Sequence, residues 1–131
     1  MTMLDHMGFN VSDFARSRAF YESALAPLGL KPLHGGDTWA VFGSGKDGDP
    51  FLWVGTSRPS YWREGDRVGA SPLHVAFRAP SASAVDAFHA AALAAGGRDN
   101  GRPGPRRGLN EYYAAFVLDP DGNNIEAAVR L

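Results

Sequence analysis

The sequence predicts an α+β fold in which two copies of one strand–helix–strand module share a chain of 131 residues. Two observations predict this fold. When the two halves of the chain are aligned with each other, His6 matches His74 and, in the same register, Phe9 matches Phe77. In both copies a segment of alternating apolar residues precedes a segment with helical periodicity, which indicates a strand followed by a helix. Since one module cannot bury both faces of its sheet, we expect the two to pack side by side.

The repeat has two registers. The register that matches His6 with His74 continues without a gap until Gly29 matches Gly97. Further along the chain a second register matches Phe42 with Phe116. The change of register predicts an insertion of six residues, which we place within Arg98–Asn110. This segment is rich in Gly, Pro and Arg, and we expect either a mobile loop over a ligand cavity or a plain surface loop.

The first module covers about residues 1–56. Its predicted elements are a strand, a helix and two further strands, over Leu4–Val11, Ser12–Ala26, Thr38–Phe42 and Phe51–Gly55. Ser12 or Asp13 is the expected N-cap of the helix, and Pro27 and Gly29 end it. A short strand near Gly29–His34, with a counterpart after Gly97, is only weakly indicated by the pattern.

The second module covers about residues 72–131 and repeats this order. Its predicted elements are Leu73–Ala79, a helix from Ser81 or Ser83 to Ala95, and the strands Tyr112–Leu118 and Asn124–Val129. Asp119-Pro120-Asp121-Gly122 between the last two strands is a strong turn signal. The connector, about residues 57–71, is rich in Gly, Pro, Ser and Arg.

Two histidines and one carboxylate form the predicted chemical site. His6 and His74 lie opposite the bulky apolar face of their strands, and Glu126 lies among apolar residues on a strand expected to be buried. A buried carboxylate must be paired, protonated or bound to a metal. We therefore predict a divalent metal site for Fe, Zn, Mn, Ni or Co. Histidines that only form structural hydrogen bonds are the competing interpretation.

Other polar and aromatic residues are predicted to complete the site. Asn10 and Arg78 occupy matching positions after the two histidines, where Arg78 suits an anionic substrate group. Glu126 is the candidate base, and Tyr113 is the candidate proton donor. The substrate-binding candidates are Asn10, Trp39, Leu52, Arg78, Asn110 and Tyr112. Packing in the core or at the rim is the alternative for the tyrosines.

Three segments carry a resemblance to a known family. LDHMGFNVSDFARSRAFYESALAPLGL, SPLHVAFRAPSASAVDAFHAAALAAGG and FVLDPDGNNIEA resemble the vicinal oxygen chelate superfamily, which includes glyoxalase I, bleomycin-resistance proteins and extradiol dioxygenases. The resemblance implies one domain over residues 1–131, with paired βαβββ modules and helices outside an incomplete barrel. It also implies metal ligands at His6, His74 and Glu126, and a homodimer.

One position departs from the glyoxalase I pattern. The family resemblance implies a glutamate-type ligand on the last strand of each module, and the second register of the repeat matches Leu52 with Glu126. Leucine can neither bind a metal nor move a proton, so glyoxalase I activity itself is not expected. Two histidines and one carboxylate remain, a ligand set associated with non-haem Fe(II) oxygenases.

The amino-acid composition limits the classes of partner that we expect the protein to bind. With 13 basic and 14 acidic residues, the net charge of −1 argues against a nucleic-acid partner, and no apolar run suits a membrane span. The N-terminus lacks the pattern of a signal peptide, so we expect a cytoplasmic protein that binds a small molecule.

Two function classes stay open. One is a metal-dependent lyase, isomerase or dioxygenase that acts on a small oxygen-chelating substrate. The other is a non-catalytic binder of the bleomycin-resistance type, which would sequester a small hydrophobic or aromatic compound. Four aromatic side chains suit such a pocket, namely Trp39, Trp53, Tyr61 and Trp62.

Overall fold

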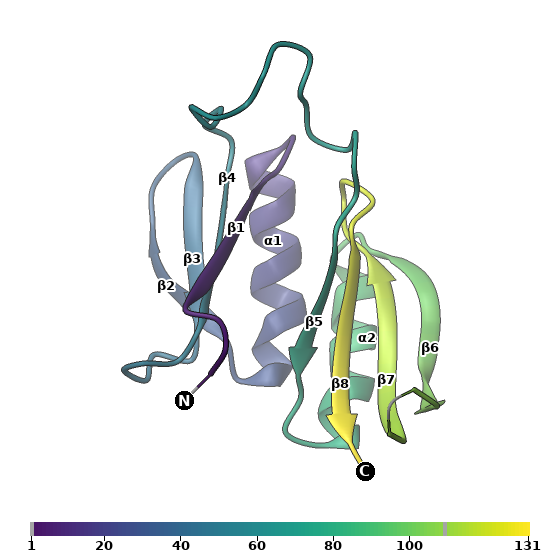
Figure 1. Ribbon diagram of the computed structural model, residues 1–131. Helices are drawn as coiled ribbons and strands as arrows, with labels where there is room; N and C mark the ends of the chain where they lie inside the picture. Colours follow the sequence, from purple (N-terminus) through teal and green to yellow (C-terminus); the bar gives the residue numbers. More distant parts are fainter. Residues whose placement is uncertain (1, 109) are drawn as a thin grey trace.

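The two modules follow the same order of elements in the computed structural model, which describes residues 2–108 and 110–131 (Figure 1). The first contains β1 (His6–Asn10), α1 (Phe14–Leu25), the 3-10 helix η1 (Ala26–Leu28), β2 (Lys31–Gly35), β3 (Trp39–Gly43) and β4 (Phe51–Gly55). The second contains β5 (His74–Arg78), α2 (Ala82–Ala94), β6 (Arg98–Arg106), β7 (Tyr112–Leu118) and β8 (Asn124–Arg130). The predicted α+β fold of two modules is confirmed.

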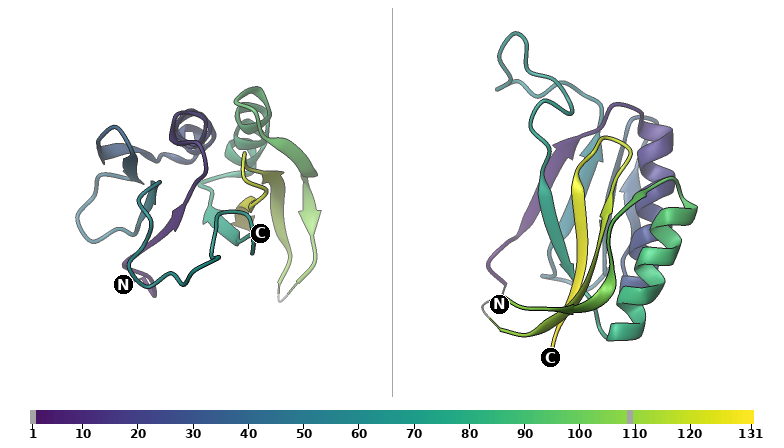
Figure 2. Two further views of the ribbon diagram at one scale, coloured as in Figure 1. Left: turned by 90° about the horizontal axis from the view of Figure 1, so that it is seen from above. Right: turned by 90° about the vertical axis from the view of Figure 1, so that its right-hand side faces the viewer.

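Each module forms a four-stranded sheet with the same topology. The strand orders are β1-β4-β3-β2 and β5-β8-β7-β6, and the first strand of each module pairs in parallel with its last strand. The described residues form two separate sheets and no closed barrel. Seen from above, α1 and α2 lie side by side while the sheets extend to either side of them (Figure 2). The modules therefore meet mainly through their helices.

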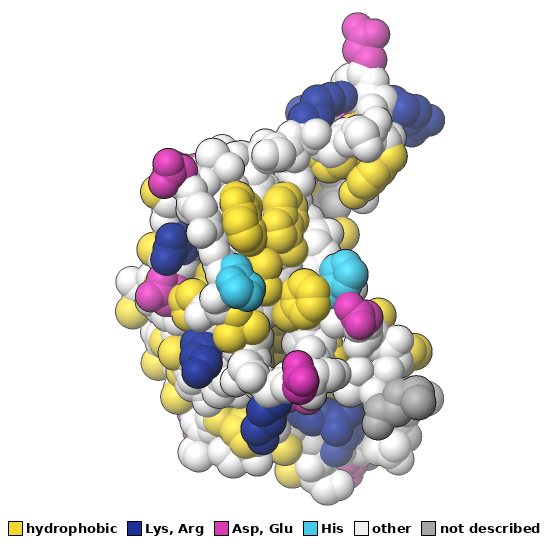
Figure 3. Space-filling model, turned by 90° about the vertical axis from the view of Figure 1, so that its left-hand side faces the viewer, with side chains coloured by type: hydrophobic (Ala, Val, Ile, Leu, Met, Phe, Trp, Pro, Cys, Tyr) yellow, Lys and Arg dark blue, Asp and Glu magenta, His cyan; other side chains and the backbone are white. Residues whose placement is uncertain are grey.

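One core joins the helices to the inner faces of both sheets. Phe20 and Tyr21 of α1 and Phe88 of α2 are fully buried in it. The alternation along each strand leaves the opposite sheet faces open, and we call these the open faces. Figure 3 views the molecule from the side of the first module, where hydrophobic and histidine side chains gather. Each sheet thus presents a second face that no helix of the described residues covers.

The helix ends follow the predicted signals. Asp13 caps α1 by accepting a hydrogen bond from the backbone nitrogen of Arg16 at 3.1 Å. Ser81 caps α2 in the same way, accepting from Ala84 at 3.1 Å. These caps satisfy backbone groups that the first turn leaves without partners.

The segment Arg98–Asn110 differs from the predicted loop. Residues Arg98–Arg106 form the strand β6, which pairs with β7 through two irregularities of register. Glycine and proline, which suggested a loop, are tolerated because β6 is an edge strand, where a proline needs no ladder partner. The weakly indicated strand after Gly97 is confirmed, and so is its counterpart β2.

Polar contacts tie the turn between β7 and β8 to the first module. The buried hydroxyl of Tyr21 donates a hydrogen bond to Asp119, and the hydroxyl of Ser12 donates to Asp121. Asp119 also accepts from the backbone and side chain of Asn123, each at 2.9 Å. The Asp-Pro-Asp-Gly turn therefore holds the modules together as well as reversing the chain.

The described part of the chain has no helix of the length and hydropathy that a membrane crossing requires.

Candidate functional site

The open face of the second sheet carries a histidine–glutamate pair. β5 pairs with β8 so that Ala76 lies opposite Glu126, which places the glutamate on the same face as His74. Nε2 of His74 donates a hydrogen bond of 2.9 Å to Oε1 of Glu126. The glutamate is only 5% exposed, whereas the imidazole side chain is 55% exposed. Within the described residues, no lysine or arginine forms an ion pair with this carboxylate.

The spacing of this pair fits a divalent metal. Metals that accept imidazole and carboxylate ligands bind them at about 2.0–2.2 Å, so two ligands at a right angle would lie about 3 Å apart. The 2.9 Å between His74 Nε2 and Glu126 Oε1 matches this separation. The pair can therefore supply two neighbouring ligands to one ion.

The third predicted ligand does not join this pair within one chain. Among the described residues, no three His, Cys, Asp or Glu side chains are grouped so that they could hold a metal ion. His6 lies on the open face of the first sheet, where its ring stacks on Phe51 at 4.8 Å. Its Nδ1 donates a hydrogen bond of 2.7 Å to Oδ1 of Asp5. The chain thus brings His74 and Glu126 together and leaves His6 on the other module.

The sheet register corrects the residue that corresponds to Glu126. Gly8 of β1 lies opposite Trp53 of β4, as Ala76 lies opposite Glu126 in the second module. Trp53, rather than Leu52, therefore occupies the equivalent position. The turn between β3 and β4 spans residues 44–50, whereas its counterpart spans 119–123 and is two residues shorter, which shifts the register. The conclusion that no carboxylate stands at this position is unchanged.

Two predicted site residues lie on the wrong side of their sheets. Leu52, a predicted substrate-binding residue, is 3% exposed in the core, on the face covered by the helices and away from the open face. Tyr113 also faces the helices. Phe116 of β7 lies opposite Glu126 on the open face, and because residues of a strand alternate between its two faces, Tyr113 lies on the other one. Its hydroxyl donates a hydrogen bond of 2.7 Å to Asp86 of α2, which raises the pKa of Tyr113. Tyr113, the candidate proton donor, therefore lies on the face opposite to the candidate base Glu126.

Most other candidates lie on the open faces. Trp39 is 37% exposed and lies opposite Gly55. Tyr112 lies under the guanidinium of Arg130, whose Cζ is 4.8 Å from the ring centroid. Arg78 is exposed at the end of β5, and Asn110 is exposed beside β7. The structure shows these four as accessible and gives none of them a contact with the His74–Glu126 pair.

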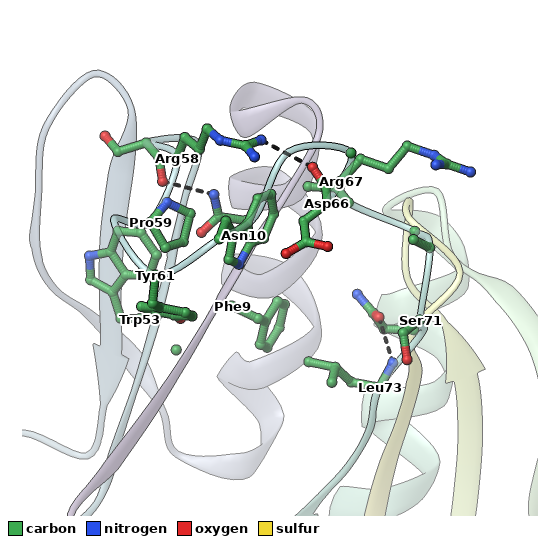
Figure 4. A pocket seen from close by; sticks show the side chains of 18 residues that line it. Phe9, Asn10, Trp53, Arg58, Pro59, Tyr61, Asp66, Arg67, Ser71 and Leu73 are labelled. Atoms are coloured by element: carbon green, nitrogen blue, oxygen red, sulfur yellow. Dashed lines mark hydrogen bonds between the residues drawn. The ribbon is translucent and has the colours of Figure 1, made fainter.

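A cavity of about 600 Å³ lies beneath the connector (Figure 4). Asn10 lies at its upper end, where its side chain donates a hydrogen bond of 2.8 Å to the carbonyl of Ser57. Of the four aromatic side chains that the sequence suggested for a pocket, three line this cavity, namely Trp53, Tyr61 and Trp62. The fourth, Trp39, lies outside the lining. Sequence reasoning missed Phe9, Asp66 and Leu73, which also line the cavity. Nothing in the connector's sequence indicated which of its charged residues faces inward.

Solved structures share this fold over nearly the whole chain. A glyoxalase/bleomycin resistance protein from Albidiferax ferrireducens is 32% identical, with a TM-score of 0.79 and coverage of 98% of this chain and 100% of that chain. A putative glyoxalase from Bacillus halodurans is 22% identical, with a TM-score of 0.68 and coverage of 97% and 95%. Lactoylglutathione lyase from Agrobacterium tumefaciens is 19% identical, with a TM-score of 0.67 and coverage of 98% and 94%. The paired modules are thus a fold of the glyoxalase type.

A family model supports the same assignment from the sequence. The model described as Glyoxalase/Bleomycin resistance protein/Dioxygenase superfamily matches residues 3–127. The chain therefore belongs to this superfamily. A search of curated proteins found no match.

Proposed function

We propose that the protein is a metal-dependent lyase, isomerase or dioxygenase that acts on a small substrate with two neighbouring oxygen atoms. The buried carboxylate of Glu126 beside the accessible imidazole of His74 carries this proposal. Burial of a carboxylate is unfavourable, and a divalent cation held by Glu126 and His74 would offset that penalty. The fold shared with a lactoylglutathione lyase supports the same class. We expect the enzyme to act in the cytoplasm.

A second copy of the chain supplies His6 in this proposal. We propose a homodimer in which the open face of the first sheet meets the open face of the partner's second sheet. A two-fold axis then creates two equal sites, each with His6 from one copy and His74 and Glu126 from the other. The hydrogen bond from His6 Nδ1 to Asp5 supports this role, because metal-binding histidines commonly donate their second ring N–H to such an acceptor.

The chain's own residues bind the substrate and move its proton. A bound divalent cation would supply Lewis acidity that polarises a substrate carbonyl. Among the hydrogen bonds of the described residues, Oε2 of Glu126 accepts none. This oxygen is therefore available to take a proton from the substrate carbon next to the polarised carbonyl. Arg78, exposed on the same open face, suits an anionic group of the substrate.

Metal content tests the proposal directly. Purified protein is reconstituted with Zn, Mn, Fe(II), Co or Ni, one metal at a time, and the bound metal is measured. We expect one ion per chain in the wild type and loss of that ion in His74→Gln and Glu126→Gln. His89→Gln is the matched control, because His89 forms a similar pair of 3.0 Å with Asp99 away from the site. Absence of stoichiometric metal from the reconstituted wild type would contradict the proposal.

A mixed dimer tests whether the site is shared between two copies. His6→Ala and Glu126→Gln each remove a ligand from both sites of a homodimer. In a mixed dimer of these variants, one site regains all three ligands, so mixing should restore metal binding to the heterodimer. A site contained in one chain would gain nothing from mixing, and that result would refute the shared site.

A second candidate function is a binder of small aromatic compounds. The cavity beneath the connector favours it, since Trp53, Tyr61 and Trp62 line a volume suitable for a drug-sized ligand. This function needs no metal. We therefore expect the Glu126→Gln variant to bind aromatic compounds as well as the wild type does, which calorimetric titration of both proteins would measure.

A further inference from the structure

We propose that the cavity beneath the connector selects organic cations, namely aromatic compounds that carry a protonated or quaternary amine. This inference rests on the second candidate function and names the class of ligand. The cavity combines aromatic walls with one inward-facing carboxylate, Asp66 (Figure 4). Aromatic faces attract cations through their quadrupole, and a carboxylate adds direct attraction.

The aromatic wall depends on two glycines. A Cβ atom at Gly55 would lie 2.6 Å from the indole carbons of Trp53, and one at Gly8 would lie 3.2 Å from Cε3 of the same ring. Because neither neighbour has a side chain, the indole lies flat over the open face of the first sheet. Trp53 and Tyr61 then stand on one side of the cavity, and Leu73 stands on the other (Figure 4).

The carboxylate of Asp66 points into the cavity and keeps an oxygen available. Oδ2 accepts a hydrogen bond of 2.8 Å from the backbone nitrogen of Arg63, which fixes the orientation of the side chain. Among the hydrogen bonds of the described residues, Oδ1 accepts none. Asp66 is half-buried, so a cation beside this oxygen would be partly shielded from water.

The arginines of the connector do not neutralise this carboxylate from within the cavity. Arg58 stacks on Trp62 at 5.4 Å and donates to the backbone carbonyls of Asp66 and Arg63. The guanidinium groups of Arg58 and Arg67 point away from the cavity in Figure 4. The side chain of Arg63 is 90% exposed, and its Nε lies 4.0 Å from Asp66 Oδ2. Arg58 and Arg67 also belong to the lining, but Asp66 is the one of these three whose charged group faces the cavity.

Three small probes separate charge from shape. Phenyltrimethylammonium is the cation, tert-butylbenzene is its neutral isostere, and benzoate is the aromatic anion. We expect calorimetric titration of the full chain to show at least about fivefold tighter binding of the cation than of tert-butylbenzene. Benzoate should bind more weakly than either, because Asp66 repels it.

Two variants that each remove one negative charge test whether Asp66 is responsible for the preference for cations. Asp66→Asn keeps an acceptor for Arg63 and removes the charge, so it should weaken cation binding about fivefold and leave tert-butylbenzene unchanged. Glu64→Gln makes the same change of charge two residues away, outside the lining of the cavity, and should alter neither affinity. Equal losses in both variants would show a diffuse effect of net charge and would overturn the proposal.

The outcomes also separate this inference from the function on which it rests. If tert-butylbenzene binds the wild type as tightly as the cation does, the cavity binds aromatic compounds but does not select cations. If none of the three probes binds, both the inference and the second candidate function fail.

Discussion

The two modules repeat one backbone and differ in what their open faces can do. At equivalent positions of the last strand, the first module has Trp53 and the second has Glu126. At the equivalent histidines, His6 stacks on an aromatic ring, whereas His74 donates to a buried carboxylate. The comparison teaches that the duplicated topology sets where a side chain stands, while the residue at that position decides which chemical group the open face offers, an indole in the first module and a carboxylate in the second.

The largest expected effect separates these two roles. Glu126→Gln should weaken metal binding at least about a hundredfold, or about 2.7 kcal/mol, and leave phenyltrimethylammonium binding unchanged. Trp53→Ala should weaken binding of this cation about tenfold and leave metal binding unchanged. Calorimetric titration of both ligands against both variants measures this. If either variant loses both ligands in a folded protein, Trp53 and Glu126 do not have separate roles.

The glycines after the two helices give the next effect. A Cβ atom at Gly97 would lie 2.5 Å from Cγ1 of Val117 and 2.7 Å from Cε1 of Phe20, so Gly97→Ala should destabilise the protein by about 2 kcal/mol. Gly29, its partner in the sequence repeat, has open space around it and a φ of +83°. Gly29→Ala should therefore cost about 1 kcal/mol, through backbone strain alone. Urea unfolding of both variants checks the order of these losses.

Much of the fold was predictable from short-range patterns. The strands Phe51–Gly55 and Tyr112–Leu118 have their predicted bounds, because alternation and turn residues mark both ends. Helix caps at Asp13 and Ser81 were among the predicted alternatives. The strand β6 was only weakly indicated after Gly97, since proline and glycine on an edge strand resemble a loop.

The candidate site was predictable only in part. The pairing of His74 with Glu126 followed from the repeat and from alternation along the strands. The assignment of Leu52 failed because the turn is two residues longer in the first module. The strand before the turn and the strand after it are therefore each displaced by one position, in opposite directions, from the single register that the sequence repeat indicated. One such slip moves a side chain to the other face of the sheet. The inward carboxylate of Asp66 lies in a connector without periodicity, where no pattern indicates direction.

Tyr21 and His89 occupy the same position in the two repeats, and we expect them to contribute differently to stability. Tyr21 is buried and donates a hydrogen bond to buried Asp119 across the modules. Tyr21→Phe leaves Asp119 with one partner fewer, and it should destabilise the protein by about 1.5 kcal/mol. Urea unfolding at neutral pH measures this. A loss no greater than that of His89→Gln would show that the contact between modules contributes little.

The stability of the protein at alkaline pH gives a second test of the contact between Tyr21 and Asp119. Burial, followed by the charge and hydrogen bond of Asp119, raises the pKa of Tyr21 well above its usual value of 10.0. Above pH 10 the unfolded chain releases this proton while the folded chain retains it, so stability should fall as pH rises. Tyr21→Phe should reduce that fall between pH 9 and 11. A smaller slope should remain, because the hydrogen bond to Asp86 also raises the pKa of Tyr113.

The smallest expected effect belongs to the exposed pair of His89 and Asp99. The hydrogen bond from His89, followed by that from the backbone nitrogen of Gly101, lowers the pKa of Asp99 below its usual value of 3.8. This contribution to stability is present above pH 3.8 and is lost as the pH falls through the lowered pKa. His89→Gln should therefore move the acid-unfolding midpoint to higher pH, by less than about half a unit because the pair is exposed. Acid titration followed by circular dichroism measures the shift. A midpoint that moves to lower pH would show that the imidazole, once charged, disfavours the fold. The contribution of His89 to stability would then differ from that of Tyr21, its counterpart in the first module, in sign as well as in size.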